Sequence, residues 1–109
     1  MTTAAQIPLI SRQYDVLETS YFPGLTITQV AKADSQRVAI GFACPSGISM
    51  GISTRSNLTV TDCAMCHTGG GIEWISFADH GSFCQLDWFA VCSTPAGKLS
   101  VFEVWYRDR

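Results

Sequence analysis

Two runs of aromatic and β-branched residues in the last quarter of the chain constrain its fold most. The runs cover residues 82–92 and 99–107, and a short segment with Pro95 and Gly97 separates them. This pattern predicts a β-hairpin with a loop of about four to six residues. Both faces of each run carry large apolar side chains, so little water is expected on either face. Such a hairpin must lie at the centre of a sandwich or pack against another subunit.

The preceding chain consists of short segments with strand character, separated by turns rich in Gly, Pro, Asp and Ser. Asp79 is expected to cap backbone amides in one of these turns, where Gly81 takes a positive φ. Tyr14, Leu17 and Tyr21 have a spacing that would suit a helix, but no segment shows a convincing amphipathic-helix period. Strands are predicted at 25–30, 37–43, 48–53, 57–61 and 72–77, a strand or irregular structure at 10–22, and a loop at 62–71.

These segments predict an all-β fold, a single-domain antiparallel β-sandwich of about seven short strands over residues 1–109. Residues 1–9 show no periodicity and precede the strands as an extended N-terminal arm. Within 37–43, Val38, Ile40 and Phe42 are expected to be buried. The opposite face of that segment has only alanine and glycine, so a bulky group can lie close against it.

Charged residues are scarce, at 15% of the chain against 47% hydrophobic residues. A typical soluble domain carries about 25% charged residues. We therefore expect part of the surface to be covered by copies of the chain or by a partner. The net charge of −2 and the scattered arginines exclude a basic stripe for nucleic acid. The absence of a secretory pattern and of long apolar runs indicates a protein made in the cytoplasm with no role in a membrane, soluble unless it leaves within a particle.

Apolar side chains of the arm and the aromatic residues of the strands are the candidates for an interface, because such groups anchor most protein contacts. The candidates are Ile7, Leu9, Trp74, Trp88, Phe89, Trp105 and Tyr106.

Cys63 to His67 form a C-x-x-C-H motif, the pentapeptide that attaches a c-type haem. The β-rich surroundings and the glycines after His67 oppose that interpretation, since the motif usually lies on a helix. Zinc is the other alternative, with Cys63, Cys66, His67 and Cys84 as ligands. Cys84 and Cys92 are not expected to share an ion, because they lie about eight residues apart on one predicted strand, too far apart if that strand is straight. The default for the five cysteines is free buried thiols, and no cofactor and no catalytic site are predicted.

Glu103 stands inside an otherwise apolar run. A buried carboxylate requires a partner, which Arg37, Arg107 or a group of a second subunit could provide. A structural ion pair is therefore predicted in preference to a catalytic acid.

Residues 33–40, 79–81, 85–90 and 101–104 resemble small β-rich structural proteins of tailed bacteriophages. The resemblance spans roughly residues 33–104 and implies a virion component, a capsid decoration (cement) protein or a part of the head, neck or tail. It further implies many copies, contact with the major capsid protein and with itself, and no catalysis. The C-x-x-C-H motif is not part of that pattern, and a small redox or metal-binding module is the alternative function.

Overall fold

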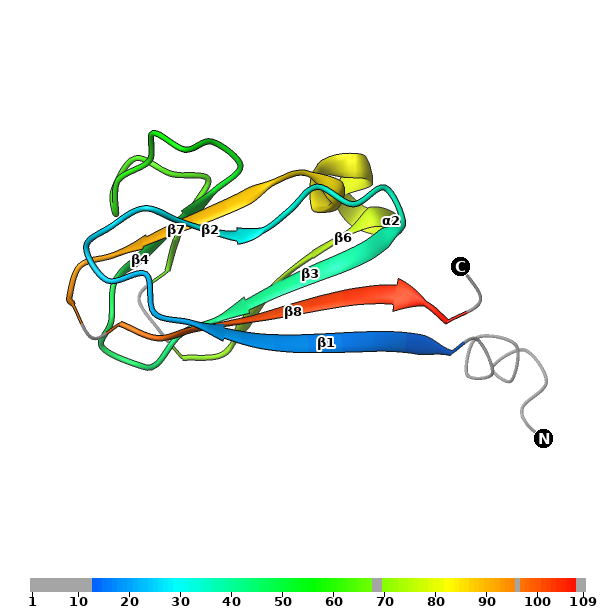
Figure 1. Cartoon of the computed structure of the whole chain (residues 1–109), viewed down its shortest axis with the longest axis horizontal. Helices are drawn as coiled ribbons and strands as arrows, with labels where there is room; N and C mark the ends of the chain where they lie inside the picture. The colour runs from blue at the N-terminus through cyan, green and yellow to red at the C-terminus, as the bar shows by residue number, and fades with distance from the viewer. Residues whose placement is uncertain (1–12, 68–69, 96, 108–109) are drawn as a thin grey trace.

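The computed structural model describes residues 13–67, 70–95 and 97–107, which form two four-stranded antiparallel sheets packed face to face (Figure 1). The first sheet has the order β1-β8-β3-β6 and the second the order β2-β7-β4-β5. The strands are β1 Tyr14–Tyr21, β2 Thr28–Ala31, β3 Arg37–Ala43, β4 Met50–Ser53, β5 Met65–His67, β6 Ile72–Ser76, β7 Trp88–Cys92 and β8 Leu99–Tyr106. The predicted antiparallel β-sandwich is confirmed, with eight strands where about seven were expected. The predicted arm at 1–9 lies outside the described residues.

The core lies between the two sheets and is built from alternate residues of the strands. Ile40 and Phe42 of β3 face Met50 and Ile52 of β4, and all four are 0% exposed. Trp88 of β7 is equally buried, with its ring 5.1 Å from that of Phe42. Each large side chain removed from water in this way contributes about 1.5–3 kcal/mol.

The predicted hairpin between residues 82–92 and 99–107 is wrong. β7 belongs to the second sheet and β8 to the first, so the two strands do not pair and the chain changes layer between them. Trp88 and Cys92 point into the core from one side, and Leu99 and Val101 point into it from the other. The alternating apolar residues correctly indicated that both runs are central. The two runs belong to different sheets, however, and their buried faces meet across the core.

Residues 82–87 are also not a strand. After the single helical turn α2 (Phe77–His80), the chain forms the 3-10 helix η1 (Gly81–Gln85) and then runs through Leu86 into β7. The side chain of Arg37 donates hydrogen bonds to the carbonyls of Cys84 and Leu86, so these groups need no partner in a sheet. Cys84 consequently does not share a strand with Cys92.

The turn at 79–81 agrees in part with its prediction. Gly81 adopts the expected positive φ of 62°. The capping group is Ser76, whose hydroxyl accepts a hydrogen bond from the amide of Asp79, and not the carboxylate of Asp79 itself.

The predicted strand at 57–61 is a loop that folds over the outer face of the second sheet. A Cβ atom on Gly51 of β4 would lie 2.5 Å from the carbonyl oxygen of Thr59, so the loop backbone rests directly on this glycine. Leu58 is 3% exposed although it belongs to no strand. The apolar residues of this segment thus seal a sheet face and do not extend the sheet.

In the part of the chain that the structure describes, no helix is long and apolar enough to cross a bilayer.

Candidate interaction surface

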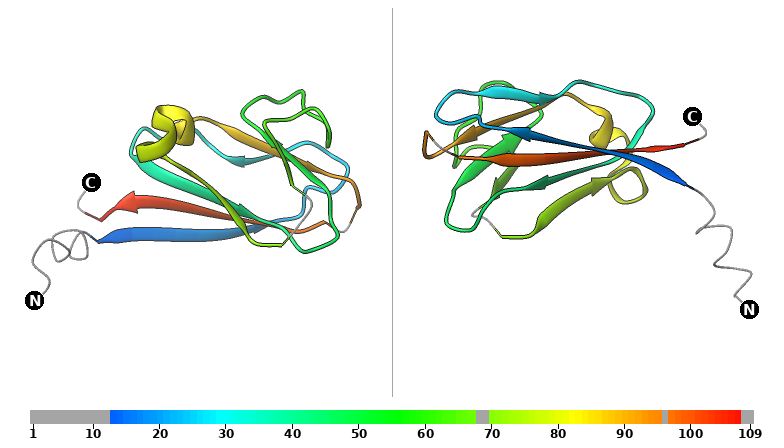
Figure 2. Two further views of the ribbon diagram at one scale, coloured as in Figure 1. Left: turned by 180° about the vertical axis from the view of Figure 1, so that it is seen from behind. Right: turned by 60° about the horizontal axis from the view of Figure 1, so that its bottom comes forward.

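The outer face of the first sheet, turned away from the core, is the candidate functional surface. The strand registers assign alternate residues of β1, β8, β3 and β6 to it. Figure 2 shows these strands as one layer, with β1 along its edge. The face comprises Tyr14, Val16, Glu18, Ser20, Ile72, Trp74, Ser76, Ala39, Gly41, Ala43, Ser100, Phe102, Val104 and Tyr106.

This outer face is apolar and accessible. Tyr14, Val16, Ile72 and Trp74, together with Phe77 at the start of α2, are each between 44% and 59% exposed. Among the described residues that the strand registers assign to this face, Glu18 is the only charged one. Scattered surface hydrophobic residues are ordinary, but a continuous apolar patch marks a contact site.

The centre of the outer face is a notch at Gly41. The rings of Trp74 and Phe102 flank this glycine, with their centroids 6.0 Å apart. A Cβ atom on Gly41 would lie 2.7 Å from the indole ring of Trp74. The prediction that a bulky group lies against the alanine and glycine face of residues 37–43 is confirmed.

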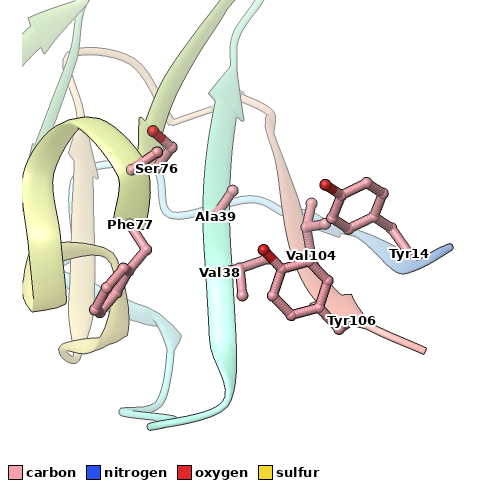
Figure 3. Close-up of a pocket in the computed structure, with 8 residues that line it drawn as sticks. Tyr14, Val38, Ala39, Ser76, Phe77, Val104 and Tyr106 are labelled. Atoms are coloured by element: carbon pink, nitrogen blue, oxygen red, sulfur yellow. The ribbon is translucent and has the colours of Figure 1, made fainter. Parts of the chain in front are cut away.

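Next to the notch lies a groove with a volume of about 370 Å³ (Figure 3). The rings of Tyr14 and Tyr106 stack on one side with centroids 5.3 Å apart, and Phe77 stands on the other, with Val38 and Ala39 between them. Val38 was expected in the core. A register shift between Arg37 and Ala39 instead places Val38, half-buried, in the groove.

On the second sheet, the loop with Leu58 and Thr59 covers the outer face of β4 at Gly51. The two layers of the sandwich are therefore unequal. The chain's own backbone partly covers the outer face of the second sheet, whereas the apolar outer face of the first sheet is exposed.

The predicted interface residues fall into different places. Trp74 and Tyr106 lie on the outer face, and Trp88 packs inside the sandwich between Phe42 and Phe83. Phe89 is half-buried in β7, and Trp105 is half-buried in β8, where its indole N–H donates to Asp34 (2.9 Å). Ile7 and Leu9 lie outside the described residues.

Sequence reasoning missed four exposed apolar residues of this surface: Tyr14, Val16, Ile72 and Phe77. The alternation of Tyr14 and Val16 was visible in residues 10–22, but it signalled only a strand. Val16 and Leu17 stay exposed on opposite faces because this strand lies at a sheet edge, whereas Tyr21 at its end packs against the core.

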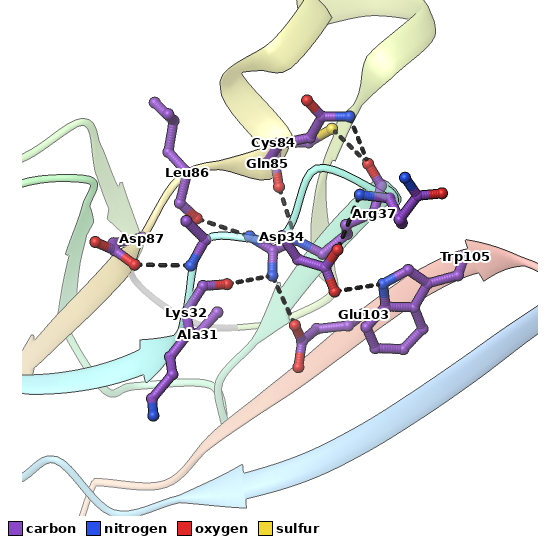
Figure 4. A network of polar contacts seen from close by, with 12 residues as sticks. Ala31, Lys32, Asp34, Arg37, Cys84, Gln85, Leu86, Asp87, Glu103 and Trp105 are labelled. Atoms are coloured by element: carbon purple, nitrogen blue, oxygen red, sulfur yellow. Dashed lines mark hydrogen bonds and ion pairs between the residues drawn. The ribbon is translucent and has the colours of Figure 1, made fainter. Parts of the chain in front are cut away.

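A polar network centred on Arg37 holds the end of the sandwich together (Figure 4). The Arg37 side chain is 0% exposed and donates from NH1 to Oε1 of Glu103 at 2.7 Å and to the carbonyl of Lys32 at 2.9 Å. It also binds the carbonyls of Cys84 and Leu86, each at 2.7 Å. The predicted structural ion pair of Glu103 is confirmed, with Arg37 as the partner. All three side-chain nitrogens of this arginine donate hydrogen bonds to other groups of the chain, so its role is to fix the fold.

Cys84 lies against this network. Its thiol is 0% exposed and contacts the carbonyl oxygens of Arg37 and Gly81, both at 3.6 Å. Burial raises the pKa of the Cys84 thiol above its ordinary value, and the nearby charge of Arg37 opposes this increase. A thiol held in its protonated form is a poor nucleophile and a poor metal ligand.

The C-x-x-C-H motif is partly extended. Met65–His67 is strand β5, which pairs with Met50–Ile52 of β4 at the edge of the second sheet. The segment predicted as a loop at 62–71 therefore contains a short strand. Cys63 precedes this strand, and its sulfur lies 3.1 Å from the carbonyl oxygen of Met65. The thiol of Cys84 instead contacts the carbonyl oxygens of Arg37 and Gly81. Within the described residues, no group of three or more His, Cys, Asp or Glu side chains is arranged to hold a metal ion.

No protein-family model and no curated protein matches the chain. Among solved structures, a protein from Bacillus endospore appendages, described as disulfide-linked pili, has a TM-score of 0.47 to this chain. The alignment covers 86% of this chain and 87% of that one at 10% identity. The similarity is too low for a shared function to follow from it.

Proposed function

We propose that this protein is a non-enzymatic structural subunit that works by docking the outer face of its first sheet onto other protein chains. The observation that carries the proposal is the continuity of that face. Apolar groups extend over all four strands from Val16 to Ile72, and Glu18 is the only charged residue among the described strand positions of this face, while the second sheet is partly covered by its own loop. Burial of such a face at an interface contributes roughly 25 cal/mol per Å² of apolar surface.

The assembly that we propose is the capsid of a tailed bacteriophage, which the protein would decorate in many copies after its synthesis in the host cytoplasm. This finer proposal is supported by the resemblance of residues 33–104 to virion structural proteins and by the scarcity of charged residues. The partner would be the major capsid protein or another virion protein.

Sedimentation with capsids tests the proposal. Capsids assembled from the major capsid protein encoded in the same genome are mixed with the purified protein and collected by centrifugation. We expect the wild type to sediment in a fixed ratio to the capsid subunits, and Trp74→Lys to remain in the supernatant because a desolvated lysine opposes apolar docking. Leu25→Lys is the matched control, because Leu25 is 64% exposed but lies in the link between β1 and β2.

Two results would contradict the proposal. If a genome carrying this gene encodes no capsid protein, or if the wild type fails to sediment with capsids, the capsid assignment is wrong. If Trp74→Lys and Leu25→Lys bind capsids equally well, docking does not use the outer face.

A further inference from the structure

The four edge strands of the sandwich differ in how well they are protected against pairing with another chain. β5 and β2 have three and four residues, and the register of β2 is shifted between Gln29 and Ala31. β6 has five residues and runs directly into α2. Short strands and irregular registers are the devices by which natural sheets prevent edge pairing.

β1 has none of these devices. It has eight residues, contains neither proline nor glycine, and pairs with β8 without any register shift. Within the described part of the chain, no strand pairs with its other edge. Val16 and Leu17 point to opposite sides of this edge and are 59% and 50% exposed. The carboxylate of Asp15 is already bound by Arg107 at 3.0 Å, which reduces its effect as a repelling charge.

We propose that two copies of the chain pair antiparallel through β1, with Leu17 of one copy opposite Leu17 of the other. The two first sheets then form one eight-stranded sheet. This inference rests on the proposed function and specifies one of its partners, a second copy of the chain.

The register follows from the side chains of β1. Residues of the same parity share a face, so pairing Leu17 with Leu17 joins the two apolar outer faces, whereas a shift by one residue would place an outer face beside an inner one. Centring on Leu17 sets Asp15 opposite Thr19 and Val16 opposite Glu18, with no like charges opposite each other. Centring on Glu18 would oppose two carboxylates, which is unfavourable, and centring on Val16 would shorten the overlap.

Cysteine cross-linking tests the register in full-length protein with Cys63→Ser and Cys66→Ser as background. Residues directly opposite in an antiparallel pair have Cα atoms about 4.5–5.5 Å apart, which suits a disulfide. With oxidised glutathione as oxidant, two Leu17→Cys thiols form one disulfide and two molecules of reduced glutathione. We expect most of the Leu17→Cys protein to run as a dimer on a non-reducing gel.

Thr19→Cys is the matched control, because Thr19 of the two copies would be offset by four residues, about 13 Å along the strand. It should give no cross-linked dimer. The Asp15→Cys/Thr19→Cys double variant should cross-link, since these two positions are opposite in the proposed register. Equal cross-linking of Leu17→Cys and Thr19→Cys, or none with either Leu17→Cys or the double variant, would overturn the inference.

Light scattering on an unlinked protein provides a second measurement that needs no cysteine. The wild type should have the mass of a dimer at tens of micromolar, and Leu17→Lys the mass of a monomer, because two ammonium groups would meet at the two-fold axis. Leu25→Lys should stay dimeric.

Capsid binding that is lost in Trp74→Lys while Leu17→Cys fails to cross-link would refute β1 pairing and leave the proposed function standing. Cross-linking of Leu17→Cys in a protein that does not bind capsids would support β1 pairing and refute the proposed function.

Discussion

Arg37 joins its own part of the chain to two distant segments, one with Cys84 and Leu86 and the other with Glu103. Its guanidinium binds the carbonyls of Lys32, Cys84 and Leu86 and the carboxylate of Glu103, whose side chain is 14% exposed. Arg37→Met would leave a nearly buried carboxylate and three carbonyls without their donor. We expect a loss of about 3–5 kcal/mol in the free energy of unfolding, measured by urea denaturation.

The matched control is Arg55→Met. Arg55 also pairs with a carboxylate, that of Asp62 at 2.6 Å, but both side chains are well exposed to water. Exposed pairs contribute about 0–1 kcal/mol. The Arg37→Met/Glu103→Leu double variant should recover part of the loss, because it removes the unpaired charge. An Arg37→Met variant as stable as Arg55→Met would show that the network does not hold the fold.

Cys84 predicts how stability changes in alkaline solution. Burial raises the pKa of its thiol in the folded protein above the ordinary value of 9.0. The unfolded chain therefore loses this proton first as the pH rises, so the contribution of Cys84 is complete below pH 9 and is lost as the pH rises through the folded pKa. Burial, and to a smaller extent the negative charge of Glu103, raises the pKa of Tyr21 above its ordinary value of 10.0. Tyr21 therefore also makes the folded protein less stable as the pH rises.

Urea denaturation at a series of pH values checks this prediction. The free energy of unfolding of the wild type should fall as the pH rises above 9. In Cys84→Ala, the free energy of unfolding should not show the decrease that begins near pH 9, but it should still show the decrease that Tyr21 causes at higher pH. The prediction is wrong if the wild type and Cys84→Ala lose stability equally between pH 9 and pH 10.

At the scale of single elements, two glycines in strands test what covers each sheet. Gly51→Ala would place a methyl group against the backbone of Thr59, so the loop must move, and we expect a loss of about 1–3 kcal/mol in unfolding free energy. Gly41→Ala meets the half-exposed ring of Trp74, which can rotate away, so its cost should be smaller. Urea denaturation gives both values, and Trp fluorescence should change in Gly41→Ala. Equal costs would mean that the loop does not seal β4.

The alternation of residues in 37–43, 48–53 and 72–77 was sufficient to predict three strands and the sandwich class, because period two directly reflects two sheet faces. It could not identify neighbours. β7 and β8 read as a hairpin because apolar residues look alike whether they meet within a sheet or across a core. Residues 82–87 were misassigned because the carbonyls of Cys84 and Leu86 bind Arg37, which lies 47 and 49 residues earlier and leaves no local signal.

The candidate surface was only partly predictable for a similar reason. Trp74 and Tyr106 were identified from residue type, but the groove exists because the register shift after Arg37 turns Val38 outward. The covering of the second sheet depends on Gly51 and Thr59, which approach each other only in the folded chain. The uneven exposure of the two sheets, from which the proposed function follows, was therefore not visible in the sequence.

At the scale of the whole molecule, a chain that completes its burial against a second copy must unfold in a concentration-dependent manner. Only the folded state pairs, so each tenfold rise in protein concentration should stabilise a dimer by about 1.4 kcal/mol. We expect the urea midpoint of the wild type to rise over a hundredfold range of concentration, about 1 to 100 µM. Leu17→Lys should have a constant midpoint, because it removes pairing at the β1 edge.

The Ile72→Lys variant distinguishes self-pairing at the β1 edge from docking through the outer face of the first sheet. Ile72 lies on β6, at the opposite edge of the first sheet from β1, and is 47% exposed. This variant should keep the concentration-dependent midpoint of the wild type and yet lose capsid binding, since it alters the outer face without reaching the two-fold axis. A wild-type midpoint that stays constant from 1 to about 100 µM would show that the folded chain is monomeric over this range. A constant midpoint in Ile72→Lys alone would place the self-contact on β6.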